Sequence, residues 1–246
     1  MSDIPFHMVR SLPIALFLVA PPIIEPSSAV AGEPAAGSPT ARHTERQGRS
    51  QLAPTIPASL EHLESAAEDI GDAVAAGNWP KATKLVGAAT RDLDALGEGA
   101  RAGDVAQARG HLDETRKAVE SRRPIEAQFA ANALSGDVVD LFVNYQPIVP
   151  VEVMRLDVLL RRVQIEGLAR TPARAANPLK EARRLWTKLE GQPPLQGTPM
   201  ARRFDRELAA VEAAAAVENP SSLEQTAGVA LEGVDGIERV FAPARR

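Results

Sequence analysis

The chain has 246 residues, a formal net charge of −4 and no cysteine. The acidic balance argues against a nucleic-acid-binding protein, which needs positive charge to meet phosphates. The lack of cysteine excludes disulfides, thiolate metal sites, lipid-modified cysteine and covalent haem attachment. Aromatic residues make up only 4% of the chain, while alanine, leucine, valine and arginine are abundant. This composition favours closely packed helices over strands.

Residues 1–31 have the pattern of a signal peptide. Arg10 precedes an apolar run, and the small residues Ala29 and Ala31 form the A-x-A arrangement that signal peptidase recognises. The run is shorter than the ~20 apolar residues that span a bilayer, and prolines interrupt it. We expect cleavage after Ala31, a periplasmic or secreted product, and no transmembrane span in the mature chain.

Residues 32–56 form a different kind of segment. They are rich in Pro, Gly, Ser, Thr and Gln, and they contain few large apolar side chains. Such a stretch cannot bury enough surface to offset the entropy of ordering it. We therefore predict a flexible tether.

Apolar residues spaced three and four apart predict eight helices in the rest of the chain. Asn or Thr close to a proline marks four helix starts, and glycine marks three helix ends. The predicted capping residues are Asn78, Thr171, Thr198 and Asn219, and the predicted left-handed glycines are Gly77, Gly97 and Gly191. The predicted helices span 58–76, 80–97, 104–121, 124–144, 150–169, 172–190, 199–217 and 220–241.

The apolar pattern of the first helix recurs 93 residues later, and the second helix repeats at the same offset. The matched positions are Leu60, Leu63, Ala67, Ile70 and Val74 with Val153, Leu156, Leu160, Val163 and Gly167. We predict an all-α fold of two tandem antiparallel four-helix units, 57–145 and 146–242, and an α-solenoid of helix pairs is the alternative. A proline-rich connector, 145–150, separates the units, and Tyr145 within it is either accessible for contact or a rigid wedge of the connector.

The candidate metal ligands are His62, His111 and Glu114. His111 and Glu114 are three residues apart on a helix, so they can share one ion, and the alternative is that they belong to a solvated helix face. The Glu-x-x-His motif of di-iron bundles does not occur. Met154 and Met200 can join the two histidines as axial haem ligands, although methionine at helical spacing is more often part of a core. No cofactor is predicted, and metal or haem binding is kept as the alternative function.

Charge is distributed unevenly along the chain. From Arg155 to Arg206 there are 12 basic and five acidic residues. This stretch can meet an anionic partner, a phosphate-rich lipid surface or the acidic helix 58–76, or it can be a solvated surface of charge pairs. The predicted partner surface consists of Arg162, Arg174, Arg183, Arg184 and Arg203. Glu64 and Glu68 are one turn apart and are interpreted as the solvent-facing side of helix 58–76.

Motifs for nucleophilic, phosphate-binding or zinc-protease chemistry do not occur in the sequence. The leading hypothesis is therefore an exported, non-enzymatic helical bundle that binds a protein partner or serves an envelope complex. The alternative is a periplasmic bundle that binds metal or haem. A third hypothesis is an enzyme with a site between the two units, which predicts a pocket lined by carboxylates of shifted pKa.

Overall fold

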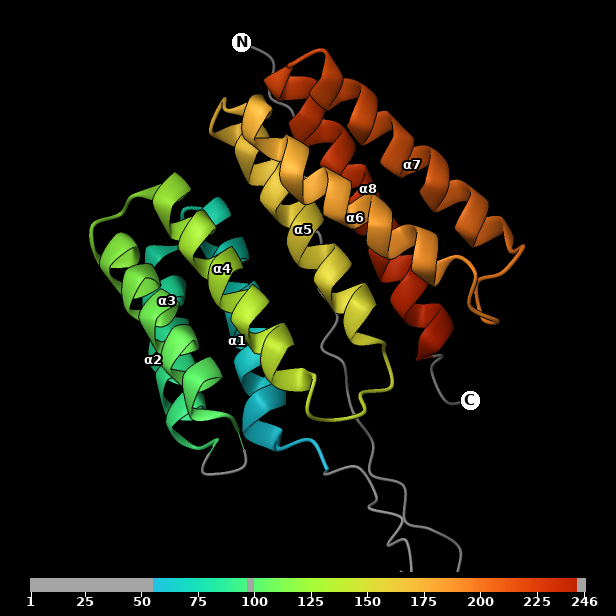
Figure 1. The fold of residues 1–246 in the computed structure, drawn as a ribbon. Helices are drawn as coiled ribbons and strands as arrows, with labels where there is room; N and C mark the ends of the chain where they lie inside the picture. Colours follow the sequence, from blue (N-terminus) through green and yellow to red (C-terminus); the bar gives the residue numbers. More distant parts are fainter. Residues whose placement is uncertain (1–54, 97–99, 243–246) are drawn as a thin grey trace, which may run out of the picture. The chain divides into compact units, whose positions relative to one another are not determined.

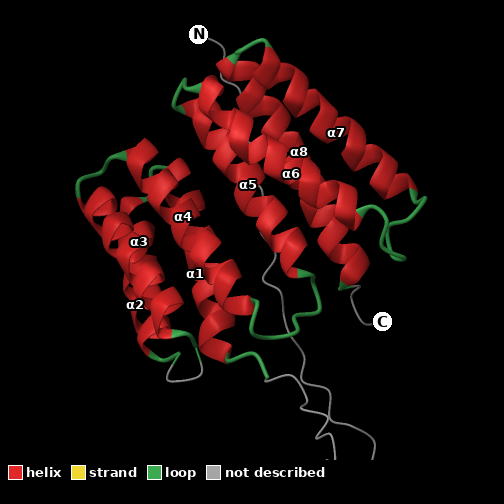
Figure 2. Ribbon diagram, in the orientation of Figure 1, coloured by secondary structure: helices red, strands yellow, loops and turns green. Residues whose placement is uncertain are grey.

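The computed structural model describes residues 55–96 and 100–242, and all regular elements in these residues are helices (Figures 1 and 2). They are α1 (Ala58–Ala75), α2 (Trp79–Asp94), α3 (Ala102–Glu120), α4 (Pro124–Phe142), α5 (Val151–Leu168), α6 (Ala176–Leu189), α7 (Pro199–Ala216) and α8 (Pro220–Phe241), with a short 3₁₀ helix, η2 (Pro172–Ala175), before α6. The predicted all-α class is confirmed. The predicted signal peptide and nearly all of the tether lie outside the described residues. Within the described ranges, no helix is long and apolar enough to cross a bilayer.

Side-chain caps begin three of the helices as predicted. Asn78, Thr198 and Asn219 each accept a hydrogen bond of 3.1 Å from the backbone N–H three residues later. The prediction for Thr171 is wrong, because its side chain caps no helix. Its hydroxyl instead donates to Oε2 of Glu166 at 2.5 Å, and a 3₁₀ turn precedes α6.

Four helix ends share one backbone geometry. A residue of positive φ follows each helix, and the N–H groups of this residue and of the next one donate to helix carbonyls in the Schellman pattern. The four residues are Gly77, Arg122, Arg170 and Glu218, with φ of 67°, 50°, 56° and 49°. Gly77 confirms its prediction. Gly191 does not, because the glycines of positive φ in the described residues are Gly77 and Gly197; Gly97 lies outside those residues.

The helices pack as bundles. The first helix group consists of α1–α4, and the second consists of α5–α8. In the first group, α1 packs against α2 and α4, and α3 packs against the same two helices. In the second group, α5 packs against α6 and α8, and α7 packs against α8. The first helix of each group therefore contacts the fourth, as expected of a four-helix bundle and not of a solenoid of stacked pairs. Figure 1 shows the α4–α5 pair side by side where the two groups meet.

The buried apolar side chains form two clusters. One comes from α1–α4 and ends at Tyr145, and the other begins at Val149 and comes from α5–α8. Met154 is half-buried and packs against both clusters. All described residues belong to one compact unit. The division into two domains and the internal repeat therefore stay predictions.

The aromatic side chains lie largely in these clusters. Trp186 is fully buried, and its ring centroid lies 4.6 Å from that of Phe204 in an edge-to-face arrangement. Trp79 is half-buried at the start of α2, where it packs against the first cluster. Of the two interpretations of Tyr145, accessibility for contact is wrong. Its side chain is buried because it closes the first cluster at the end of α4.

Candidate functional site

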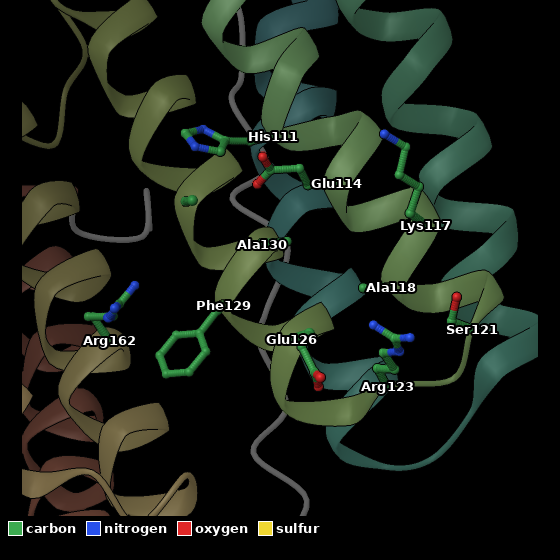
Figure 3. A pocket seen from close by; sticks show the side chains of 11 residues that line it. His111, Glu114, Lys117, Ala118, Ser121, Arg123, Glu126, Phe129, Ala130 and Arg162 are labelled. Atoms are coloured by element: carbon green, nitrogen blue, oxygen red, sulfur yellow. The ribbon is translucent and has the colours of Figure 1, made fainter.

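A groove of about 570 Å³ runs along α3 and α4, with α5 contributing to one side (Figure 3). We call it the α3–α4 groove. Its lining residues are His111, Glu114, Lys117, Ala118, Ser121, Arg123, Glu126, Phe129, Ala130, Ala133 and Arg162. The groove brings together the predicted metal candidates His111 and Glu114 and the predicted partner residue Arg162.

A buried carboxylate holds His111 in place. Nδ1 of His111 lies 2.5 Å from Oδ2 of Asp137 on α4, and Nε2 of Gln107 donates to Oδ1 at 2.7 Å. Burial raises the pKa of Asp137, while the hydrogen bonds from His111 and Gln107 act in the opposite direction. The contact holds the His111 ring against α4, with one hydrogen shared between Nδ1 and Oδ2. Nε2 of His111 is the ring nitrogen that does not contact Asp137.

Arg162 connects a buried carboxylate to an aromatic ring. Glu166 has no exposed surface, and its Oε1 accepts from Nε of Arg162 at 2.9 Å. The guanidinium carbon lies 4.2 Å from the centroid of the Phe129 ring. Figure 3 shows Phe129 extending from α4 toward Arg162. The cation is therefore fixed between Glu166 and Phe129 before any ligand arrives.

The rest of the groove carries charges of both signs. Lys117 and Arg123 are positively charged, Glu114 and Glu126 are negatively charged, and all four side chains are exposed. Alanines from α3 and α4 complete the lining between them. A lining of this mixed character suits a polypeptide surface better than a ligand of one charge.

The metal and haem candidates lie in four different surroundings. His62 is exposed, with Nδ1 3.8 Å from Oδ1 of Asp92, whereas His111 contacts Asp137. Met154 packs against both apolar clusters, and Met200 packs against the second. In the part of the chain that the structure describes, no group of three or more His, Asp or Glu side chains is arranged to hold a metal ion.

Ion pairs engage four of the five arginines predicted as a partner surface. The pairs are Arg162–Glu166, Arg183–Asp205, Arg183–Glu212, Arg184–Glu181 and Arg203–Glu207. Arg174 forms no ion pair within the described residues. Arg162 belongs to the α3–α4 groove, and Arg203 borders a second hollow of about 650 Å³ along α7 and α8. These arginines do not share one surface hollow, and the partner surface stays a prediction.

The structure corrects the interpretation of Glu64 and Glu68 as solvent-facing. Both are half-buried and interact with charges on α5. They belong to a group that we call the carboxylate cluster: Glu64, Glu68, Asp72, Asp157, Asp235 and Glu238. Burial raises the pKa of Glu64 to about 7 and that of Glu238 to about 8, and repulsion from neighbouring carboxylates is the second cause. The same causes raise the pKa of Glu68 well above its ordinary value.

Arg161 joins two helices in this cluster. Its Nη1 lies 3.5 Å from Oδ1 of Asp72 on α1, and its Nε lies 3.3 Å from Oδ2 of Asp157 on α5. One arginine of the basic stretch thus meets the acidic helix α1. The carboxylate cluster lines neither the α3–α4 groove nor the hollow along α7 and α8.

Sequence reasoning missed three residues that shape the groove. Glu166 lies four residues after Arg162, so the pair can be found from helical spacing alone. Asp137 and Phe129 carry no such signal, because their contacts with His111 and Arg162 cross between helices.

Comparison of the chain with family models, curated proteins and solved structures gives no match. Function is therefore inferred from the residues of the groove.

Proposed function

We propose that the protein is exported and serves as a non-enzymatic helical binding module of the cell envelope, which holds a protein partner in the α3–α4 groove. The observation that carries the proposal is the stack of Arg162 on Phe129. Arginine and aromatic side chains are enriched at the centres of protein interfaces. Here one of each lies at a groove that also offers donors and acceptors of both charge signs.

The pairing of Arg162 supports this role. Because Glu166 holds the guanidinium in one position, a partner does not have to immobilise a free arginine side chain when it binds. The buried Asp137 fixes the His111 ring in the same way. A preorganised surface loses less conformational entropy on association than a mobile one.

Export rests on residues 1–31, which lie outside the described residues. Mass spectrometry of the protein purified from its own host is expected to give the mass of Gly32–Arg246. Ala31→Arg removes the small residue that signal peptidase requires, so this variant is expected to keep its leader. Gln51→Arg is the control and should be processed normally. A wild-type protein that retains Met1–Ala31 would contradict the proposed export.

Partner binding is tested by a photo-crosslinking amino acid introduced at position 129 and, in separate cells, at Thr83. Position 129 lines the groove, whereas Thr83 is exposed on α2 outside it. We expect one discrete crosslinked product from position 129 and none from position 83. Adding Arg162→Ala to the position-129 variant should reduce the yield several-fold, because truncation of an interface arginine typically weakens binding strongly.

Two controls make this test interpretable. Arg184→Ala removes an exposed arginine that pairs with Glu181 away from the groove, and it should leave the crosslinking yield unchanged. Circular dichroism should show that each variant keeps its helices. Equal crosslinking from positions 129 and 83, or none from position 129, would contradict the groove as the contact surface.

A further inference from the structure

One end of the α3–α4 groove is built around the imidazole ring of His111. Nδ1 of this ring lies 2.5 Å from Oδ2 of Asp137, whose side chain is only 5% exposed. Nε2 of Gln107 donates to the other oxygen of the same carboxylate at 2.7 Å, so both oxygens of Asp137 are engaged. A buried carboxylate that is itself held in place therefore fixes the orientation of the His111 ring.

The other ring nitrogen of His111 is not used inside the protein. Within residues 55–96 and 100–242, Nε2 has no hydrogen-bond partner, and the side chain is 32% exposed and lines the groove. Histidines that ligate a metal almost always bond through their second ring nitrogen to a carboxylate, a carbonyl or water, which sets the ring orientation. His111 has this arrangement, with Asp137 as the outer carboxylate.

Glu114 supplies a second donor close to this ring. It lies three residues after His111 on α3, where side chains are neighbours on the helix surface, and both residues line the groove. Figure 3 shows His111 and Glu114 at one end of the groove, and Arg123 and Glu126 at the other. Glu114 is exposed and forms no ion pair in the part of the chain that the structure describes. Its carboxylate is therefore available to a ligand.

The chemistry of these two donors selects a class of ligand. Imidazole nitrogen suits Zn²⁺, Ni²⁺ and Cu²⁺, whereas Mg²⁺ and Ca²⁺ are bound mainly by oxygen atoms. In the described ranges no third His, Asp or Glu side chain is grouped with this pair to hold a metal ion. A closed protein site has four ligands, so the remaining coordination positions are open to water or to a donor from another molecule.

The cations of the groove limit the affinity of such a site. Arg162 is paired with the buried Glu166, with Nε 2.9 Å from Oε1, so its charge is compensated locally. Lys117 lies three residues after Glu114, is exposed and forms no ion pair within the described residues. Its charge repels a metal ion, so Lys117→Gln should strengthen metal binding or leave it unchanged.

We infer that His111 and Glu114 form a binding site for a divalent transition-metal ion at this end of the α3–α4 groove. Nε2 of His111 and the carboxylate of Glu114 are the ligands, and Asp137 is a positioning residue that holds the ring through Nδ1. The site goes beyond the proposed function, because it is a property of the isolated chain and needs no protein partner.

Calorimetric titration of the purified full chain with zinc chloride tests the site. The protein is prepared without a histidine tag and is titrated near neutral pH. We expect one strongest site, and His111→Gln should abolish it. Glu114→Gln should weaken zinc binding several-fold, and Asp137→Asn should weaken it about 10- to 100-fold, the usual effect of losing an outer carboxylate. Circular dichroism of each variant should show an unchanged helical signal.

His62→Gln is the matched control. His62 is exposed, its Nδ1 lies 3.8 Å from Oδ1 of Asp92, and no Asp or Glu stands three or four residues away from it on α1. This variant and His43→Gln should bind zinc like the wild type, and an excess of Mg²⁺ should not displace the zinc. Nitrogen-15 NMR of the imidazole rings should show zinc shifting the Nε2 signal of His111 and leaving both ring signals of His62 unchanged.

Four results would overturn the inference. They are no zinc binding by the wild type, wild-type affinity in His111→Gln, wild-type affinity in Glu114→Gln, and loss of the strongest site in His62→Gln. Wild-type affinity in Asp137→Asn would contradict the positioning role of the buried carboxylate. Crosslinking at position 129 is measured separately, so failure of the metal site and failure of the proposed partner binding are distinguishable.

Discussion

Gly167→Ala is expected to lower the free energy of unfolding by about 3 kcal/mol, the upper end of the usual cost of overpacking. A Cβ atom at this position would lie 2.7 Å from the backbone nitrogen of Glu224 and 2.9 Å from the carbonyl oxygen of Pro220. Both neighbours are backbone atoms at the start of α8, so no side-chain rotation can relieve the clash. Helices α5 and α8 would have to separate, and urea denaturation monitored by circular dichroism measures the loss.

Two other glycines provide matched controls. Gly228→Ala lies on α8 and faces α5, but its new Cβ would approach only Nε2 of Gln164, at 3.1 Å, which a flexible side chain can accommodate. Gly110→Ala on α3 meets nothing within 4 Å and should stabilise the protein by about 0.5–1 kcal/mol through helix propensity. A Gly167→Ala variant as stable as the wild type would show that α5 and α8 are not in close backbone contact.

Raising the pH from about 5 to about 9 is expected to lower the free energy of unfolding by several kcal/mol. At about 1.4 kcal/mol per unit of pKa shift, the two shifts give roughly 8 kcal/mol as an upper bound, which water around the half-buried carboxyl groups reduces. The pKa of Glu64 is raised to about 7 and that of Glu238 to about 8 in the folded protein. The folded state therefore binds more protons than the unfolded state between these values and about 4.5. The stability that Glu64 and Glu238 contribute is fully present below about pH 4.5, and it is lost as the pH rises from there to about 8.

A second effect limits stability at low pH. Hydrogen bonding to Lys188 lowers the pKa of Glu152, so this pair contributes stability that is lost as the pH falls. We therefore expect maximal stability near pH ~5. Glu64→Gln combined with Glu238→Gln should flatten the alkaline side of the profile, whereas Glu114→Gln, which changes an exposed residue, should not. Urea denaturation at a series of pH values gives the free energy of unfolding as a function of pH. A wild-type free energy of unfolding that rises from pH 5 to pH 9 would contradict the predicted direction.

Local patterns predicted the helices well because the signals that define them are local. Apolar spacing located the helices, and Asn78, Thr198 and Asn219 cap their helices as expected. Thr171 follows the same Thr-Pro pattern as Thr198, yet its hydroxyl bonds to the buried Glu166. A tertiary contact overrides the local preference at that position, and the sequence pattern does not contain it.

The candidate site was only partly predictable for the same reason. His111, Glu114 and Arg162 were identified by residue type, but their grouping in one groove follows from the packing of α3, α4 and α5. Helical periodicity also cannot show that Glu64 and Glu68 interact with charges of α5. Helical periodicity shows which residues share a face of a helix. Whether that face is solvent-exposed or buried depends on the neighbouring helix.

The antiparallel helix order has a consequence for folding kinetics. Each turn closed by Gly77, Arg122 or Glu218 joins helices that are neighbours in sequence, so the pairs α1–α2, α3–α4 and α7–α8 form through local contacts, which are fast to reach. The contacts α1–α4 and α5–α8 join the most distant helices within each group and have the largest loop-closure entropy. We therefore expect these two contacts, one in each helix group, to form later than the local pairs. The buried side chains of the first cluster end at Tyr145, so we expect the α1–α4 contact to begin forming while the second half of the chain is still being synthesised, and Val151 and Met154 to join the cluster afterwards.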